Sequence, residues 1–149
     1  MNRKKIIATL LAAGILVSPA LFASDWRYLS STENTTVSLD VQSVHFKGAV
    51  AKAWILSDYD PPTTLQRGYT SLSASSSKAL YFFDCDSDTS AVAEYVYASG
   101  KGGNGAVVES WNIPSSQRLE FSEVVPDSIG EAMLRAVCNM RPKPRKKPM

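Results

Sequence analysis

The sequence predicts an α+β fold, in which one antiparallel β-sheet of about six strands packs against one C-terminal α-helix in a single domain with one disulfide. Short segments rich in β-branched and aromatic residues recur between turn-like clusters, which is typical of antiparallel strands. Near the C-terminus the apolar residues change to a helical period. Cys85 falls in a predicted strand and Cys138 at the end of the predicted helix, so a disulfide would join the two.

Residues 1–23 are predicted to be a secretory signal peptide. Three positive charges at 1–5 precede an apolar run at 6–17, whereas a membrane-spanning helix needs about twenty apolar residues. Ala20 and Ala23 offer two cleavage points, and we expect cleavage after Ala23. The mature protein is therefore expected to be periplasmic or secreted, with outer-membrane association open and no transmembrane segment left. No cysteine follows the apolar run, so we do not expect a lipoprotein.

The mature chain divides by charge into an acidic domain, 24–140, and a basic, proline-rich tail, 141–149. The domain holds 8 basic and 14 acidic residues, a net charge of −6. A nucleic-acid-binding domain would carry basic residues on its folded surface, so we expect no nucleic-acid partner. The tail is expected to be disordered, because a charged segment with three prolines cannot bury a core. Its basic residues could contact an anionic surface or an acidic partner, or merely keep the chain soluble: Arg141, Lys143, Arg145, Lys146 and Lys147.

The first predicted strands have the clearest sequence patterns. A strand is expected at 26–29, and 35–41 alternates with Val37 and Leu39 on one face. The segment 49–59 also alternates, and Asp60-Pro61-Pro62 is expected to end it. Further strands are expected at 68–74, 79–85, 91–98 and 106–113. The serine run 75–77 leaves open whether 68–85 forms two strands or one long bulged strand.

The helix is predicted to begin after Pro126. Its apolar positions recur at helical spacing: Ile129, Ala132, Met133, Ala136 and Val137, with Leu134 beside them. Ser128 and Glu131 have the spacing of a capping box, and Glu131 lies four residues before Arg135. We expect Met133 and Ala136, in the middle of the apolar stripe, to dock the helix on the sheet.

Two cysteines in an exported chain predict a disulfide rather than two buried free thiols. Linking Cys85 to Cys138 closes a loop of about fifty residues, which stabilises the fold by roughly 4 kcal/mol on the chain-entropy model. This pairing would fix the C-terminal helix against a strand of the sheet.

Three motifs suggest a cofactor, a metal or catalysis, and each has a simpler interpretation. Gly100, Gly102 and Gly105 match G-x-G-x-x-G, but a strand-like segment follows where a dinucleotide site needs a helix. Asp84, Asp86 and Asp88 alternate as in a calcium loop, yet glycine and glutamate are missing at the sixth and twelfth positions. The glycines are therefore interpreted as a hairpin loop and the aspartates as an acidic turn, with a weak incidental metal site as the alternative.

His45 is the only histidine of the chain. It abuts a predicted turn, and no nucleophile-elbow pattern accompanies it, so it is interpreted as a solvated surface residue. We expect no catalytic residues, no metal ligands and no cofactor.

The aromatic residues could form a contact surface, as aromatic residues do at protein interfaces. The alternative is that one alternating set fills the core, which we expect for at least half of them. The residues concerned are Trp54, Tyr59, Tyr69, Tyr81, Phe82, Phe83, Tyr95, Tyr97 and Trp111.

In the order of its segments the chain resembles the surface-adhesin protein E family of exported bacterial proteins. The resemblance rests on Trp26, Val37-Ser38-Leu39-Asp40, Ala53-Trp54, Tyr69-Thr70-Ser71, Asp84-Cys85, Tyr95, Gly105-Ala106-Val107-Val108, Pro126-Asp127-Ser128, Gly130-Glu131 and Cys138. It implies an antiparallel sheet on one C-terminal helix, and a surface that binds host matrix and plasma proteins such as vitronectin, laminin and plasminogen.

The sequence thus leads to a non-catalytic, adhesin-like binding module of the bacterial envelope with a protein partner. The alternative is a structural or accessory subunit of a periplasmic or secretion assembly, in which the basic tail docks on another subunit.

Overall fold

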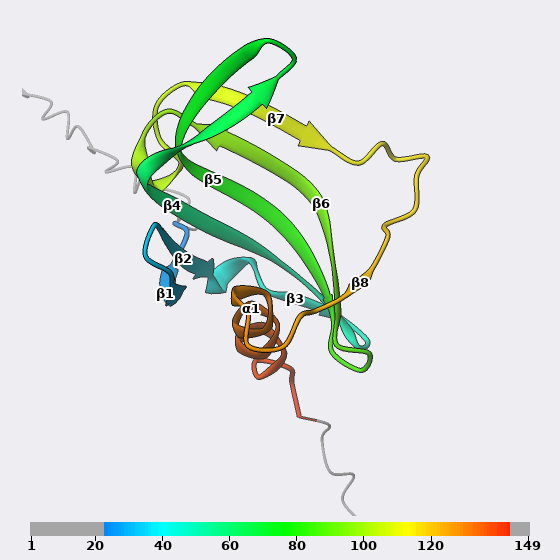
Figure 1. Ribbon diagram of the computed structural model, residues 1–149. Coiled ribbons are helices and arrows are strands. Elements are labelled where there is room, and N and C mark those ends of the chain that lie inside the picture. The colour runs from blue at the N-terminus through cyan, green and yellow to red at the C-terminus, as the bar shows by residue number, and fades with distance from the viewer. Residues whose placement is uncertain (1–22, 144–149) are drawn as a thin grey trace, which may run out of the picture.

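The computed structural model describes residues 23–143, and these form one antiparallel sheet with one α-helix on part of its face (Figure 1). The predicted signal peptide therefore lies, but for Ala23, outside the described residues, as do Arg145, Lys146 and Lys147 of the tail. Within residues 23–143, no helix is long and apolar enough to cross a membrane.

The sheet has eight strands rather than about six. The strands are β1 (Trp26–Ser31), β2 (Thr35–Asp40), β3 (His45–Lys47), β4 (Val50–Arg67), β5 (Thr70–Asp84), β6 (Thr89–Ala98), β7 (Val107–Asn112) and β8 (Ser122–Glu123), and the helix is α1 (Ile129–Cys138). The strand order is β1-β2-β4-β5-β6-β7, while β3 pairs with β4 and β8 with β6. The two additional strands have three and two residues, too few to show an alternating pattern in the sequence.

Strand β4 continues through Asp60-Pro61-Pro62, so the predicted end of this strand is wrong. Proline lacks the N–H that a sheet ladder needs, and the β4–β5 register accordingly shifts between Asp58 and Thr63 before pairing resumes. The strand bulges and then continues to Arg67. The sequence left open whether residues 68–85 form one strand or two. They contain the single strand β5.

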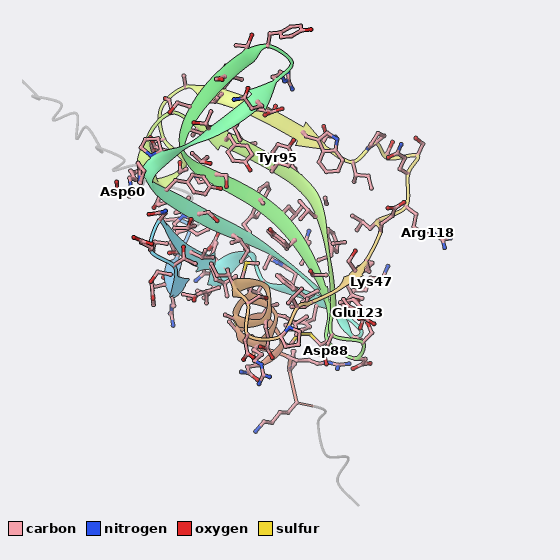
Figure 2. The ribbon with its side chains drawn as sticks, in the orientation of Figure 1. Lys47, Asp60, Asp88, Tyr95, Arg118 and Glu123 are labelled. Atoms are coloured by element: carbon pink, nitrogen blue, oxygen red, sulfur yellow. A yellow bond between two sulfur atoms is a disulfide. The ribbon has the colours of Figure 1, made fainter. Side chains whose placement is uncertain are left out.

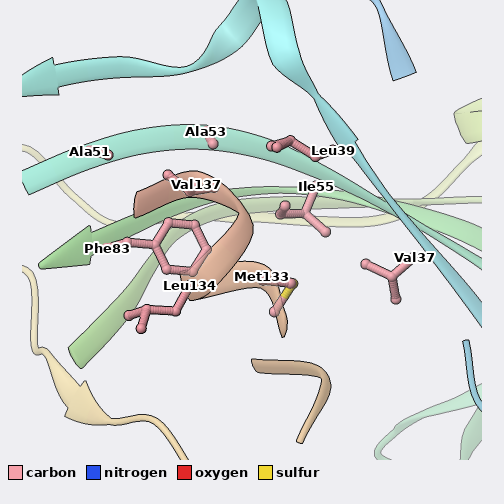
Figure 3. Packing of buried hydrophobic residues seen from close by; sticks show 9 residues of the cluster. All are labelled: Val37, Leu39, Ala51, Ala53, Ile55, Phe83, Met133, Leu134 and Val137. Atoms are coloured by element: carbon pink, nitrogen blue, oxygen red, sulfur yellow. The ribbon is translucent and has the colours of Figure 1, made fainter. Parts of the chain in front are cut away.

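The core lies between α1 and the alternate residues of the central strands (Figure 3). Its buried side chains are Val37, Leu39, Ala51, Ala53, Ile55, Phe83, Met133, Leu134 and Val137. The small alanines of β4 leave room for the helix to approach the sheet closely. Ala136 is only half-buried whereas Leu134 is buried. The face of α1 that docks on the sheet is therefore centred closer to Leu134 than predicted.

The helix begins as its sequence indicates. The Ser128 hydroxyl accepts a hydrogen bond from the Glu131 N–H at 3.2 Å, and Glu131 pairs with Arg135 one turn later. The Glu131 carboxylate accepts from the Asp127 N–H at 2.8 Å, one residue earlier than in a standard capping box. Hydrogen bonds to Arg135 and to this amide lower the pKa of Glu131, so the carboxylate is ionised at neutral pH.

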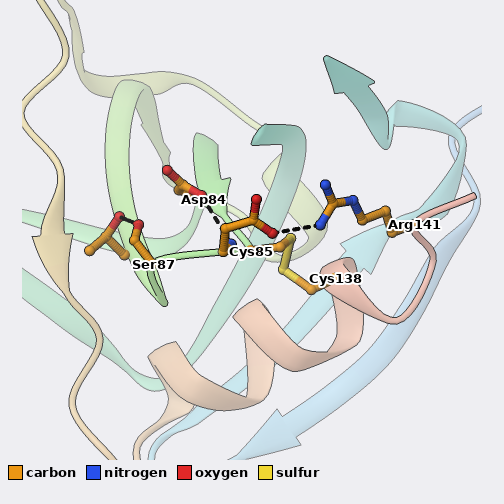
Figure 4. Close-up of a disulfide and its surroundings, with 7 residues drawn as sticks. Asp84, Cys85, Ser87, Cys138 and Arg141 are labelled. Carbon is orange, nitrogen blue, oxygen red and sulfur yellow. Dashed lines mark hydrogen bonds and ion pairs between the residues drawn. A yellow bond between two sulfur atoms is a disulfide. The ribbon is translucent and has the colours of Figure 1, made fainter. Parts of the chain in front are cut away.

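Cys85 and Cys138 form the predicted disulfide, with their Cα atoms 5.6 Å apart (Figure 4). The bond joins the start of the β5–β6 turn to the last residue of α1. It fixes the helix at this end of the sheet.

Candidate functional site

The face of the sheet that carries α1 continues beyond the helix into a second region, which is lined by aromatic side chains. Because strand residues alternate between faces, Ala51, Ala53 and Ile55 share a face with Ser57 and Tyr59 of the same strand. Strand β5 pairs with β4 and continues the same face. Ala53 lies opposite Tyr81, Ile55 opposite Ala79 and Ser57 opposite Ser77. The helix packs on the first half of the face, and a cavity lies on the second half, with Ile55 and Tyr81 at the boundary between the two.

We call this second region the tyrosine groove, a cavity of about 370 Å³. It is lined by Ile55, Ser57 and Tyr59 of β4, Ser77, Ala79 and Tyr81 of β5, Val92, Tyr95 and Tyr97 of β6, and Trp111 of β7. None of these side chains carries a charge at neutral pH. Figure 2 places Tyr95 among the aromatic side chains on the far side of the sheet centre from α1.

The aromatic rings of the groove stack on one another. The ring centroids of Tyr59 and Tyr97 lie 6.3 Å apart and those of Tyr95 and Trp111 lie 5.7 Å apart, in each case with nearly parallel planes. Tyr95 also meets Tyr97 edge-on at 5.4 Å. Such contacts add to the stability of each ring position beyond the burial of its area. The groove therefore has ordered aromatic walls.

The pKa values of two phenol groups in the groove, those of Tyr81 and Tyr97, are raised. Burial and the neighbouring Tyr59 raise the pKa of Tyr97 to about 12, and burial also raises the pKa of Tyr81. Tyr59 and Ser77 share a hydrogen bond of 2.7 Å between their hydroxyl oxygens. The groove thus offers apolar ring faces together with neutral hydroxyl groups.

An ion pair lies next to the groove residue Tyr97. Arg67, at the end of β4, donates to the Glu109 carboxylate of β7 at 2.8 Å, and Glu109 lies directly opposite Tyr97. The Glu109 side chain is only 18% exposed. This ion pair ties the long β4–β5 hairpin to β7, and the two lie near each other in the ribbon of Figure 1.

Some of the aromatic residues line one surface cavity, and the expectation that at least half of them fill the core is wrong. Of the nine, only Phe83 is fully buried, and Tyr69 lies at the tip of the β4–β5 hairpin with its side chain fully exposed. Five of them gather in the tyrosine groove. The alternation Tyr95-x-Tyr97 indicates that these two rings share a face, but no sequence signal places them beside Tyr59 and Trp111.

Of the five predicted electrostatic residues, the structure describes Arg141 and Lys143, and neither lines the groove. Arg141 donates to the Asp86 carboxylate at 2.7 Å, at the disulfide end of the sheet (Figure 4). Lys143 is exposed, and the other three basic residues lie outside the described part of the chain. The alternating aspartates form the β5–β6 turn, where the Asp84 side chain accepts from the Asp86 N–H. Among residues 23–143, no three acidic, histidine or cysteine side chains are placed to hold a metal ion.

The glycine motif forms the β6–β7 connection, as predicted, and this loop is tied down to the sheet. Asp58 accepts a hydrogen bond from the Gly102 N–H at 2.6 Å, and the buried Ser76 hydroxyl accepts from the Gly103 N–H at 2.9 Å. Both glycines have positive φ, which other residues rarely adopt. His45 is exposed on β3, as predicted.

Comparisons with known proteins agree with this architecture. The family model for surface-adhesin protein E matches residues 26–139. The selenomethionine form of Haemophilus influenzae protein E superposes with a TM-score of 0.56 at 13% identity, covering 84% of this chain and 94% of that chain. Crystal form II of the same Haemophilus protein superposes with a TM-score of 0.56 at 15% identity, covering 85% and 97%.

The comparison with curated proteins found no match. The solved structures share only the fold at this identity, whereas the family model covers all the described strands and the helix. The chain belongs to the surface-adhesin protein E family.

Proposed function

We propose that this protein is an exported, non-catalytic binding module of the bacterial envelope, and that it holds protein partners in the tyrosine groove. The observation that carries the proposal is the gathering of four tyrosines and Trp111 around one cavity on the uncovered half of the sheet face. Tyrosine and tryptophan are enriched at protein interfaces because they bury a large apolar area and still form hydrogen bonds. Membership of an adhesin family supports a binding role.

The proposal includes export by the predicted signal peptide, with Ser24 as the first mature residue. It also includes a protein partner of the adhesin type, namely a host or matrix protein. Cell fractionation with N-terminal sequencing tests the first part. Ser24 at the mature terminus of a surface or culture-medium fraction supports it, and intact Met1 in a membrane fraction contradicts it. Periplasmic retention with a co-purifying partner would favour the accessory-subunit alternative.

The binding part is tested with immobilised matrix and plasma proteins and the purified mature protein. Trp111→Ala should reduce capture strongly, because Trp111 is 42% exposed and forms a wall of the groove. Tyr69→Ala is the matched control, since it removes an exposed aromatic ring that does not line the groove. Equal capture of both variants would place the binding surface elsewhere, and no capture at all would contradict the adhesin-type partner.

A further inference from the structure

We propose that the tyrosine groove binds the proline-rich segment 141–149 of a second copy of this chain, in polyproline II conformation. The inference rests on the proposed function, because it names a partner for the same groove. The chain would then join to its neighbour head to tail, through one groove and one tail per contact.

The walls of the groove suit a polyproline II segment. Such segments dock between aromatic side chains, which contact the proline rings without the need for charge. The nearly parallel pairs Tyr59–Tyr97 and Tyr95–Trp111 supply two aromatic ridges side by side, and tyrosine hydroxyls line the same cavity. Polyproline II leaves its backbone carbonyls unpaired, so they can accept hydrogen bonds from protonated tyrosines.

The spacing of the tail fits the groove. Polyproline II has three residues per turn, so Pro142, Arg145 and Pro148 share one face and span about 19 Å. Along β6 the groove extends from Val92 to Tyr97, about 17 Å at the rise of a strand. Both prolines can therefore lie over aromatic rings at once, with the Arg145 guanidinium between them above a tyrosine face.

The tail cannot lie along the whole groove of its own molecule. Arg141 is held beside the β5–β6 turn, because its N–H donates to the Cys138 carbonyl at 3.1 Å and Cys138 is disulfide-bonded to Cys85. The far end of the groove at Ser77 is nine residues along the chain from Asp86, about 30 Å in an extended strand. The eight residues after Arg141 reach only about 25 Å in polyproline II. The groove that the tail occupies therefore belongs to a second copy.

The charges of the two parts are complementary. Residues 24–140 have a net charge of −6, and the tail carries five basic residues. Because Glu109, opposite Tyr97, is already paired with Arg67, the attraction comes from the net charge of the domain. Opposite charges speed the encounter and are screened by salt over roughly 8 Å at physiological ionic strength, so association should weaken as salt rises.

Sedimentation velocity of the mature chain 24–149, over a range of concentrations at low and moderate salt, tests the proposal. We expect concentration-dependent association, and Pro148→Ala should weaken it more than Pro144→Ala, which lies off the binding face. Arg145→Ala should likewise weaken it more than Lys146→Ala, although both remove one charge. Trp111→Ala should raise the dissociation constant at least about tenfold, while Tyr69→Ala leaves it unchanged.

A second measurement follows the Trp111 indole N–H by NMR while a synthetic peptide of residues 141–149 is added to the mature chain. A saturable shift of this signal, absent with a peptide whose three prolines are alanine, supports the groove as the site. A chain that stays monomeric and shows no shift overturns the proposal, and so does association that Trp111→Ala leaves unchanged. Neither result affects capture of matrix proteins, so the two proposals fail separately.

Discussion

The two halves of one sheet face, the half under α1 and the tyrosine groove, are built from the same strands but differ in the size of their side chains. Under the helix, β4 contributes Ala51 and Ala53, whose small side chains let α1 approach, and Phe83 fills the remaining space. In the groove, the same face of the strands carries tyrosines instead, and α1 does not extend over this part of the sheet within the described residues. One half is therefore core, and the other is a partly exposed surface with a cavity.

Removing a large ring should be costly under the helix and nearly harmless in the groove. Phe83→Ala leaves a cavity in a fully buried position and should lower the free energy of unfolding by about 3–5 kcal/mol. Trp111→Ala removes a partly exposed ring and should lower it by less than about 1 kcal/mol. Urea unfolding of both variants measures the difference. Equal losses would show that the groove belongs to the core.

The disulfide should contribute nearly as much as the core ring. Replacing Cys85 and Cys138 with serine removes a cross-link between residues 53 apart and should lower the free energy of unfolding by about 2–5 kcal/mol. Thermal unfolding monitored by circular dichroism measures the effect, with reduced wild type as the comparison. A melting temperature unchanged by the substitutions would mean that packing alone holds α1 against the sheet.

Alkaline pH should act through the groove. The pKa of Tyr97 is raised to about 12 by burial and Tyr59, against about 10 in the unfolded chain, so the folded state retains a proton that the unfolded state loses. The contribution of Tyr97 to the free energy of unfolding should be fully present below pH 10 and fall as pH rises from 10 toward 12. Tyr97→Phe should reduce this fall, whereas Tyr28→Phe, at an exposed position, should not. Identical pH profiles for all three proteins would refute the assignment.

The smallest effect is expected at the junction with the tail. Arg141 and Asp86 are 41% and 66% exposed, and such surface ion pairs contribute less than about 1 kcal/mol. Arg141→Ala should therefore hardly change the melting temperature, and a double-mutant cycle with Asp86→Ala measures the coupling. A coupling of several kcal/mol would mean that the pair is part of the core at this end.

The fold could be predicted from local patterns because its main elements are regular. Alternation at Val37 and Leu39 and the helical spacing of Met133 and Val137 show directly which side chains are buried. The continuation of β4 through Pro61 could not be predicted in this way, because a proline that usually ends a strand lies here in a bulge of the β4–β5 hairpin. The strands β3 and β8 were missed because they are too short to show a period.

The sequence by itself determined the fold class, the paired cysteines, the helix cap and the charge division between domain and tail. These features depend on residues near one another in the chain, or on composition. Only the tertiary structure decided that Tyr59, Tyr81, Tyr95, Tyr97 and Trp111 surround one cavity and that Arg67 meets Glu109. Strand register and the position of the helix bring these distant residues together. Neither can be inferred from the local preferences of the residues for helix or strand.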